Sequence, residues 1–109
     1  MPRLKRALTP SLAKTAAGLG QRIELARARR DLSATLFAER VGIDPKTLAR
    51  LEAGDPNVSL GSYLKALRVL RLEGDIDQVA SQDGLGRKLQ DARALRARGR
   101  KAEPMPKAP

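Results

Sequence analysis

Residues 32–54 read LSATLFAERVGIDPKTLARLEAG, and this stretch predicts two short helices joined by a tight turn. Ser33 and Asp44 suit helix starts, because their side-chain oxygens accept hydrogen bonds from the free N–H groups of a first turn. Pro45 suits the first helical position, where its missing N–H costs nothing. Gly42 suits the left-handed conformation that ends the first helix. Two helices joined in this way form the unit that lays one helix in the major groove of DNA.

The composition of the 109-residue chain limits its chemistry. Lys and Arg number 22 against 12 Asp and Glu, and the net charge of +10 favours a polyanion such as nucleic acid as partner. The chain has no Cys and no His, which excludes disulfides, thiolate or imidazole metal sites and Ser-His or Cys-His catalysis. Phe37 and Tyr63 are its only aromatic residues, too few to bind single strands by stacking. We therefore expect no enzymatic activity and no cofactor.

Neither a membrane span nor a signal peptide is indicated. No apolar run approaches the roughly 18 residues that cross a bilayer. The start of the chain, MPRLKRALTP, lacks the apolar core of a signal peptide. We therefore expect a cytoplasmic protein that has no membrane contact.

The composition changes along the chain and predicts one domain with extensions. Residues 1–11 are basic and carry two prolines, which predicts a flexible arm. Residues 12–72 form the expected helix-turn-helix domain. Residues 73–98 combine an acidic linker with a basic helix and are a candidate partner contact. Residues 99–109 have three prolines and no apolar period, which predicts a disordered tail.

Apolar residues at helical spacing predict an all-α fold. The predicted helices run from a cap at Thr15 to about Arg30, from Ala34 to Val41, from Pro45 to about Ala53, from Leu60 to Arg71 and from Arg87 to about Arg98. The predicted inward stripe of the fourth helix comprises Leu60, Leu64, Leu67 and Leu70, and Tyr63 and Ala66 broaden it. A helical turn is expected near Asp75–Ala80, and a break at Gly84–Gly86. The small core favours a homodimer, since small domains bury a smaller fraction of their surface.

The second helix of the opening stretch carries the residues predicted to read bases. Lys46 and Arg50 are four residues apart and share a face. The guanidinium fork of Arg matches O6 and N7 of guanine, while Lys46 can bind guanine or phosphate. Thr47 can bond a phosphate or touch a thymine methyl group, and Pro45 offers apolar contact. Outside such a motif, these residues would be read as solvated surface.

Helix starts supply the predicted phosphate contacts. The first turn at Ser33 and Ala34 and the turn at Asn57 and Ser59 present N–H groups at the positive end of a helix dipole. Such contacts position a protein on DNA without reading sequence. The serines would act as caps whether or not DNA is bound.

Arg27 and Glu52 lie on otherwise inward-leaning parts of their helices. We expect a partly buried ion pair that locks the first helix to the third. The alternative is two exposed charges, which contribute little to stability.

Two spaced patterns carry a family resemblance: Leu19-Gly20-x-x-Ile23-x-x-x-Arg27 and Leu32-Ser33-x-x-x-Phe37-Ala38-x-x-Val41-Gly42-Ile43-x-x-x-Thr47-Leu48-x-Arg50-Leu51-Glu52-x-Gly54. Over about residues 19–72 the chain resembles the Xre/lambda-repressor-like helix-turn-helix family. The resemblance implies a five-helix DNA-binding domain, usually of a homodimeric repressor of transcription. It further implies base contacts at Pro45, Lys46, Ala49 and Arg50, and pairing of Arg27 with Glu52.

Three residues depart from the family pattern. Ala34 replaces a common Gln that contacts phosphate, so this contact falls to backbone or neighbouring groups. Leu36 stands where acidic residues are usual, which hints at apolar contact with a partner. Asp55 lies in a loop that is often basic, which argues against phosphate binding there.

The stretch Glu52–Leu72 and the tail after it are similar to HipB-type antitoxins, which accompany HipA-type kinase toxins. The similarity implies a kinase toxin as partner and repression of the protein's own operon, whose double-stranded operator should be an inverted repeat. One alternative is a stand-alone or phage-type Xre regulator, and another is a basic adaptor that binds protein. The carboxylates of Asp75, Asp77 and Asp83 follow no recognised metal-ligand spacing and are better read as a solvated linker.

Overall fold

The computed structural model describes residues 7–101 and the side chains of residues 7–99. Its elements are α1 (Pro10–Arg29), α2 (Ala34–Val41), α3 (Pro45–Glu52), α4 (Leu60–Val69), the 3-10 helix η1 (Glu73–Gln78) and α5 (Gly84–Lys101). The predicted all-α class is therefore confirmed for the described residues. The chain divides into two compact units between Ile76 and Asp77, inside η1.

Side-chain caps begin the first four helices. The oxygens of Ser33, Asp44 and Ser59 accept hydrogen bonds from backbone N–H groups at 3.1, 2.7 and 3.0 Å. In α1 the cap is Thr9, which accepts from the N–H of Leu12 at 3.2 Å. The predicted cap at Thr15 is wrong, because its hydroxyl donates back to a carbonyl inside the helix.

The earlier start of α1 changes the predicted arm. Residues 10 and 11 belong to α1, because a proline at the first helical position follows a capping threonine. Residues 1–6 of the predicted arm lie outside the described residues.

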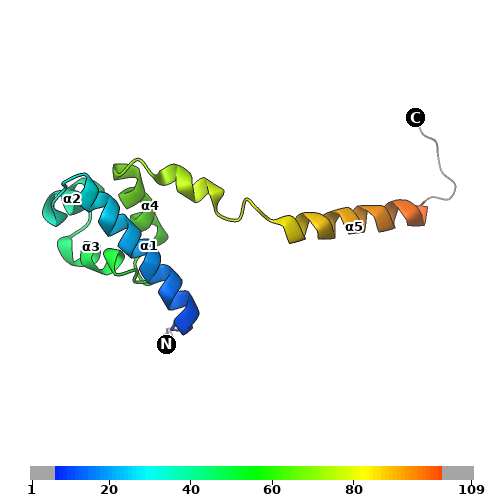
Figure 1. Ribbon diagram of the computed structural model, residues 1–109, viewed down its shortest axis with the longest axis horizontal. Helices are drawn as coiled ribbons and strands as arrows, with labels where there is room; N and C mark the ends of the chain where they lie inside the picture. The colour runs from blue at the N-terminus through cyan, green and yellow to red at the C-terminus, as the bar shows by residue number, and fades with distance from the viewer. Residues whose placement is uncertain (1–6, 102–109) are drawn as a thin grey trace, which may run out of the picture. The chain divides into compact units, whose positions relative to one another are not determined.

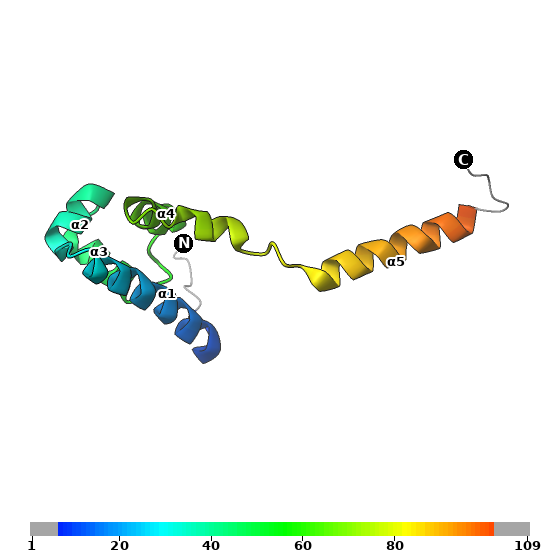
Figure 2. The same ribbon diagram turned by 45° about the horizontal axis from the view of Figure 1, so that its top comes forward.

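In the first unit, α1 lies beside α3, and α2 contacts both α3 and α4 (Figures 1 and 2). The largest fully buried side chains come from every one of these helices or from the residue that follows one: Ile23, Phe37, Leu48, Leu51 and Leu70. Ile43, in the turn before α3, is partly buried and packs against this core. One face of α3 therefore packs against the core, and the opposite face is exposed to solvent.

A close approach of two glycines joins α1 to the end of α3. A Cβ atom on Gly20 would lie 2.5 Å from the backbone nitrogen of Gly54 and 2.6 Å from the carbonyl oxygen of Glu52. Gly54 itself has a φ of +77°, which a side chain rarely adopts, and its missing Cβ would overlap Ala16. These glycines allow two backbones to touch.

The buried face of α4 contains most of the predicted residues, since Tyr63, Ala66, Leu67 and Leu70 are buried. The prediction is wrong for Leu60, which is 67% exposed, and Leu64 is only half-buried. Leu60 lies one turn before Tyr63, at the edge of the core, where it lines an apolar pocket instead of filling the interior.

The second unit consists mainly of α5. Helix α5 starts at Gly84, so the predicted break at Gly84–Gly86 is wrong. The carboxylate of Asp83 accepts a hydrogen bond from the N–H of Gly86 at 3.0 Å, and this contact lets a helix begin within the glycines. Residues 99–101 are helical and not part of a disordered tail, while 102–109 lie outside the described residues.

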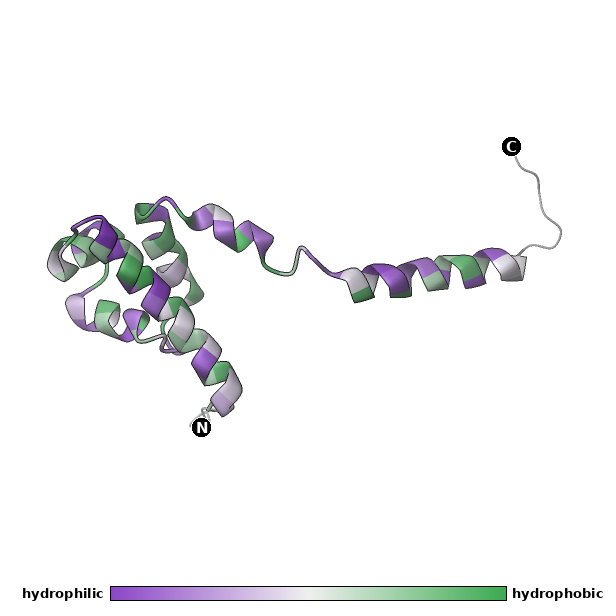
Figure 3. Ribbon diagram, in the orientation of Figure 1, coloured by the Kyte–Doolittle hydropathy of each residue, from purple (hydrophilic) through white to green (hydrophobic). Residues whose placement is uncertain are grey.

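Along α5, Figure 3 shows separate hydrophobic positions on a mainly hydrophilic helix. The large hydrophobic residues Leu85, Leu89 and Leu95 of α5 are each more than half exposed. None of the helices within residues 7–101 combines the length and the apolar character needed to cross a membrane.

Candidate nucleic-acid interface

The turn between α2 and α3 sets how α3 is presented. Gly42 ends α2 with a φ of +87°, and its N–H and that of Ile43 both donate to the carbonyl of Ala38, at 2.8 and 3.0 Å. Leu48 and Leu51 of α3 are fully buried in the core. The chain therefore fixes both the start and the rotation of α3.

Most of the residues predicted to read bases lie on the open face of α3. Pro45, Lys46, Ala49 and Arg50 are exposed, while Thr47 is half-buried. The backbone N–H of Thr47 donates to Asp44 at 2.7 Å. Any contact that Thr47 makes with a ligand must therefore come from its side chain.

The cap of α3 carries a charge. Hydrogen bonding from Thr47 lowers the pKa of Asp44 below its ordinary value of 3.8, so this carboxylate is ionised at neutral pH. A negative charge there stabilises the positive end of the helix dipole. It also disfavours a phosphate at that point.

The predicted phosphate contacts lie at the starts of α2 and α4. Ser33, Ala34, Asn57 and Ser59 are all exposed. Both serine oxygens accept backbone hydrogen bonds as caps, and the Ser59 hydroxyl also donates to Ser62 at 3.1 Å. A phosphate would therefore be bound mainly by N–H groups of the first helical turns.

The structure contains the ion pair between Arg27 and Glu52. The guanidinium donates from Nε to Oε2 at 2.7 Å and from Nη2 to Oε1 at 3.1 Å, and its Nη1 donates to the carbonyl of Leu32 at 3.0 Å. The two side chains are only 15% and 10% exposed. The hydrogen bond to Glu52 raises the pKa of Arg27 above its ordinary value. One side chain of α1 thus fixes both the end of α3 and the connection to α2.

Arg30 performs a similar task for α4. Its guanidinium donates to the carbonyl of Ala26 at 2.9 Å and to that of Leu70 at 3.1 Å. Helical spacing in the sequence did not predict a partner for Arg30, because the C-terminus of α4 comes near Arg30 only in the folded protein. Such a contact satisfies a carbonyl that the helix end leaves unpaired.

A second ion pair, absent from the sequence predictions, involves a residue predicted to read bases. Nε of Arg50 donates to Oδ2 of Asp55 at 2.8 Å, and Oδ1 of Asp55 accepts from the N–H of Asn57 at 2.8 Å. The only signal in the sequence is the acidic residue in a loop that is basic in the resembled family. In the structure, this acidic residue, Asp55, pairs with Arg50.

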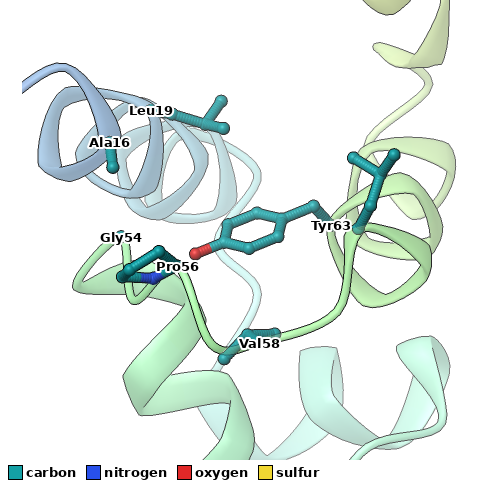
Figure 4. Close-up of a pocket in the computed structure, with 7 residues that line it drawn as sticks. Ala16, Leu19, Gly54, Pro56, Val58 and Tyr63 are labelled. Carbon is teal, nitrogen blue, oxygen red and sulfur yellow. The ribbon is translucent and has the colours of Figure 1, made fainter. Parts of the chain in front are cut away.

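Tyr63 holds the same loop from the other side. Its ring reaches from α4 towards the Gly54–Pro56 segment (Figure 4), and its hydroxyl donates to the carbonyl of Asp55 at 2.7 Å. Burial, and to a smaller extent the charge of Asp55, raises the pKa of this phenol above 10.0. The loop that follows α3 is therefore fixed to the core.

The same tyrosine lines an apolar pocket of about 260 Å³. Its other lining residues are Ala16, Leu19, Gly54, Pro56, Val58 and Leu60. The lining is almost entirely apolar and the Tyr63 hydroxyl is already bonded, so the pocket offers little to orient a polar cofactor. Within residues 7–101 there is no group of three or more Asp, Glu, His or Cys side chains that could hold a metal ion.

Comparison with known proteins gave one finding. A family model described as a helix-turn-helix domain matches residues 18–79, which is more than half of the chain. The match begins within α1 and extends beyond η1, so it includes every residue predicted to contact bases or phosphates. No curated protein and no solved structure matches the chain.

Proposed function

The chain belongs to the helix-turn-helix domain family, and we propose that it represses transcription by binding specific sequences of double-stranded DNA. The observation that carries the proposal is the open face of α3. A helix held from behind by buried Leu48 and Leu51 presents Lys46 and Arg50 to solvent, beside exposed Pro45. This is the arrangement that major-groove reading requires, because base edges are reached by side chains near the start of the second helix.

The proposed reading divides the work among α3 residues. Arg50 would bind O6 and N7 of a guanine, and Lys46 would bind a guanine or a phosphate. Pro45 and Ala49 would make apolar contacts, of which a thymine methyl group is the natural partner. Thr47, half-buried at the start of the helix, would bond a phosphate or touch such a methyl group.

Phosphate contacts would set the position of α3 in the groove. We place them at Ser33 and Ala34 in α2, and at Asn57 and Ser59 before α4. Ala34 has no polar side chain that could hold α3 in position. The ion pair of Arg27 with Glu52 would instead hold α3 in position from inside the domain.

We further propose that the protein binds as a homodimer of the Xre/lambda-repressor-like type. Two α3 helices would enter successive major grooves about 34 Å apart, so the operator would be an inverted repeat. Exposed Leu12, Leu36 and Leu60 offer apolar surface for such pairing. Basic residues of α5 would add affinity for any sequence by releasing counterions from DNA.

The antitoxin role is the narrowest part of the proposal. Its support is the similarity of Glu52–Leu72 to HipB-type antitoxins, together with the exposed leucines and basic charge of α5. Under this proposal the dimer binds a HipA-type kinase toxin and represses their shared operon. A kinase-like reading frame beside the gene would favour this role over that of a stand-alone regulator.

A footprint on the protein's own upstream DNA tests the proposal. We expect a protected inverted repeat, with Arg50→Ala lowering affinity for that repeat far more than for random DNA. Lys88→Ala in α5 is the matched control and should weaken binding to both DNAs alike. Equal losses on both DNAs for Arg50→Ala would refute the assignment of α3 as the reader. A salt-resistant protein complex with no footprint would favour the adaptor alternative.

A further inference from the structure

We infer that Asp55 is a specificity-determining residue that positions the guanidinium group of Arg50 for a guanine. The inference rests on the proposed function and deepens it. It starts from the ion pair between Nε of Arg50 and Oδ2 of Asp55, at 2.8 Å. The bond runs through Nε, and the two Nη groups of the same guanidinium are the atoms that can bind O6 and N7 together.

Asp55 is itself firmly held. Its Oδ1 accepts from the N–H of Asn57 at 2.8 Å, and its own N–H donates to the carbonyl of Arg50 at 3.0 Å. Its carbonyl accepts from the buried Tyr63 at 2.7 Å. Backbone and carboxylate are therefore both tied to surrounding structure, so the carboxylate is a fixed support and not a mobile surface charge.

The exposure of the pair argues against a role in stability. The side chain of Arg50 is 46% exposed and that of Asp55 is 26% exposed. Ion pairs that open to solvent contribute little to the free energy of folding, because water screens them. Such a pair can still restrict the conformation of the arginine side chain. This restriction matters for binding, because a long side chain loses rotamer freedom when it binds a ligand. Asp55 removes part of that freedom before DNA arrives.

The charge of Asp55 would normally oppose DNA binding. A carboxylate close to the groove repels phosphates, so it lowers affinity for every sequence alike. The proposed gain is in discrimination, because an arginine held by its Nε has fewer ways to satisfy a base other than guanine. Asp55 therefore exchanges general affinity for selectivity at one base pair.

The first test needs no DNA. The Nε–H resonance of Arg50 is followed by proton–nitrogen NMR in the wild type and in Asp55→Ala. We expect a slowly exchanging, ordered Nε–H in the wild type and a fast-exchanging one in the variant. An Nε–H that is equally mobile in both proteins would overturn the positioning role.

The second test measures discrimination. The readout is the ratio of affinities for the operator and for an operator whose Arg50-contacted guanine is replaced. Asp55→Ala should lower this ratio about twofold to tenfold, the range expected for releasing one long side chain. In an Arg50→Ala background it should have no further effect on the ratio. An unchanged or increased ratio, or an equal gain in affinity for all DNA, would overturn the inference.

Two further variants serve as controls. Asp75→Ala removes an exposed carboxylate of η1 and should leave the ratio unchanged, which separates positioning from net charge. Asp55→Asn keeps a carbonyl oxygen for the loop and covers the case in which Asp55→Ala does not fold. It should also lower the ratio, by a smaller factor, and an unchanged ratio would count against the inference.

The outcomes also separate this inference from the proposed function. A wild type that does not distinguish the operator from random DNA refutes the proposed function, while the NMR test still decides whether Asp55 positions Arg50. A wild type that discriminates, together with an Asp55→Ala protein that discriminates equally well, refutes only the inference.

Discussion

Replacing Gly20 with alanine should destabilise the domain even though alanine favours helices. The added Cβ would lie 2.5 Å from the nitrogen of Gly54 and within 2.7 Å of the carbonyl oxygens of Glu52 and Leu51. All three are backbone atoms, so none can move aside as a side chain could. Relief requires α1 to shift away from the end of α3.

The magnitude follows from two opposing effects. Overpacking of this kind costs about 1–3 kcal/mol, and a clash with three backbone atoms belongs at the upper end. Alanine in a helix interior recovers about 1 kcal/mol relative to glycine. The free energy of unfolding should therefore fall by about 2 kcal/mol. For a domain of this size that corresponds to a melting temperature lower by roughly 8–16 °C.

Gly18 provides a matched control in the same helix. A Cβ there would meet only the mobile end of the Arg22 side chain, at 3.2 Å. Gly18→Ala should therefore raise the free energy of unfolding by up to about 1 kcal/mol. The two substitutions are chemically identical and should have opposite signs.

Urea unfolding followed by tyrosine fluorescence measures both variants. Tyr63 is the only tyrosine, the chain has no tryptophan, and its ring lies in the first unit, so the signal reports on that unit alone. A Gly20→Ala protein as stable as the wild type, or two variants that shift in the same direction, would refute the close approach of α1 and α3.

Three further outcomes test the supports of α3. Glu52→Gln leaves Arg27 without its charged partner and should lower the free energy of unfolding by about 2 kcal/mol in urea, since hydrogen bonds to charged groups contribute about 1.5–3 kcal/mol; an unchanged midpoint would contradict a structural role for the pair. Because the pKa of Asp44 is lowered in the fold, the stability it provides is present above its ordinary pKa of 3.8 and lost as pH falls through the lowered value, so Asp44→Asn should remove that part of the acid dependence of unfolding. The raised pKa of Tyr63 works in the opposite sense: its contribution is present below pH 10.0 and lost as pH rises through the raised value. Tyr63→Phe should therefore flatten the alkaline limb of stability measured by circular dichroism, at a cost of about 1 kcal/mol at neutral pH.

Local sequence signals predicted the central helices well. Ser33, Asp44 and Ser59 act as caps and Gly42 adopts the left-handed conformation, because each effect depends only on residues within one turn. The start of α1 was predicted at Thr15, but the helix begins after Thr9, the threonine that is followed by proline.

The amino-acid sequence by itself determined the all-α class, the helix-turn-helix unit and the exposed face of α3, because these follow from caps, turn residues and apolar spacing. Only the tertiary structure decided which contacts hold that face in place. Gly20 reads in sequence as a weak point of a helix, and in the fold it is the place where two backbones meet. Arg50 reads as a solvated or DNA-facing charge, and in the fold it is held by Asp55. The first depends on the distance between two separate segments, and the second on how the loop after α3 folds back on the helix, and spacing along one helix supplies neither.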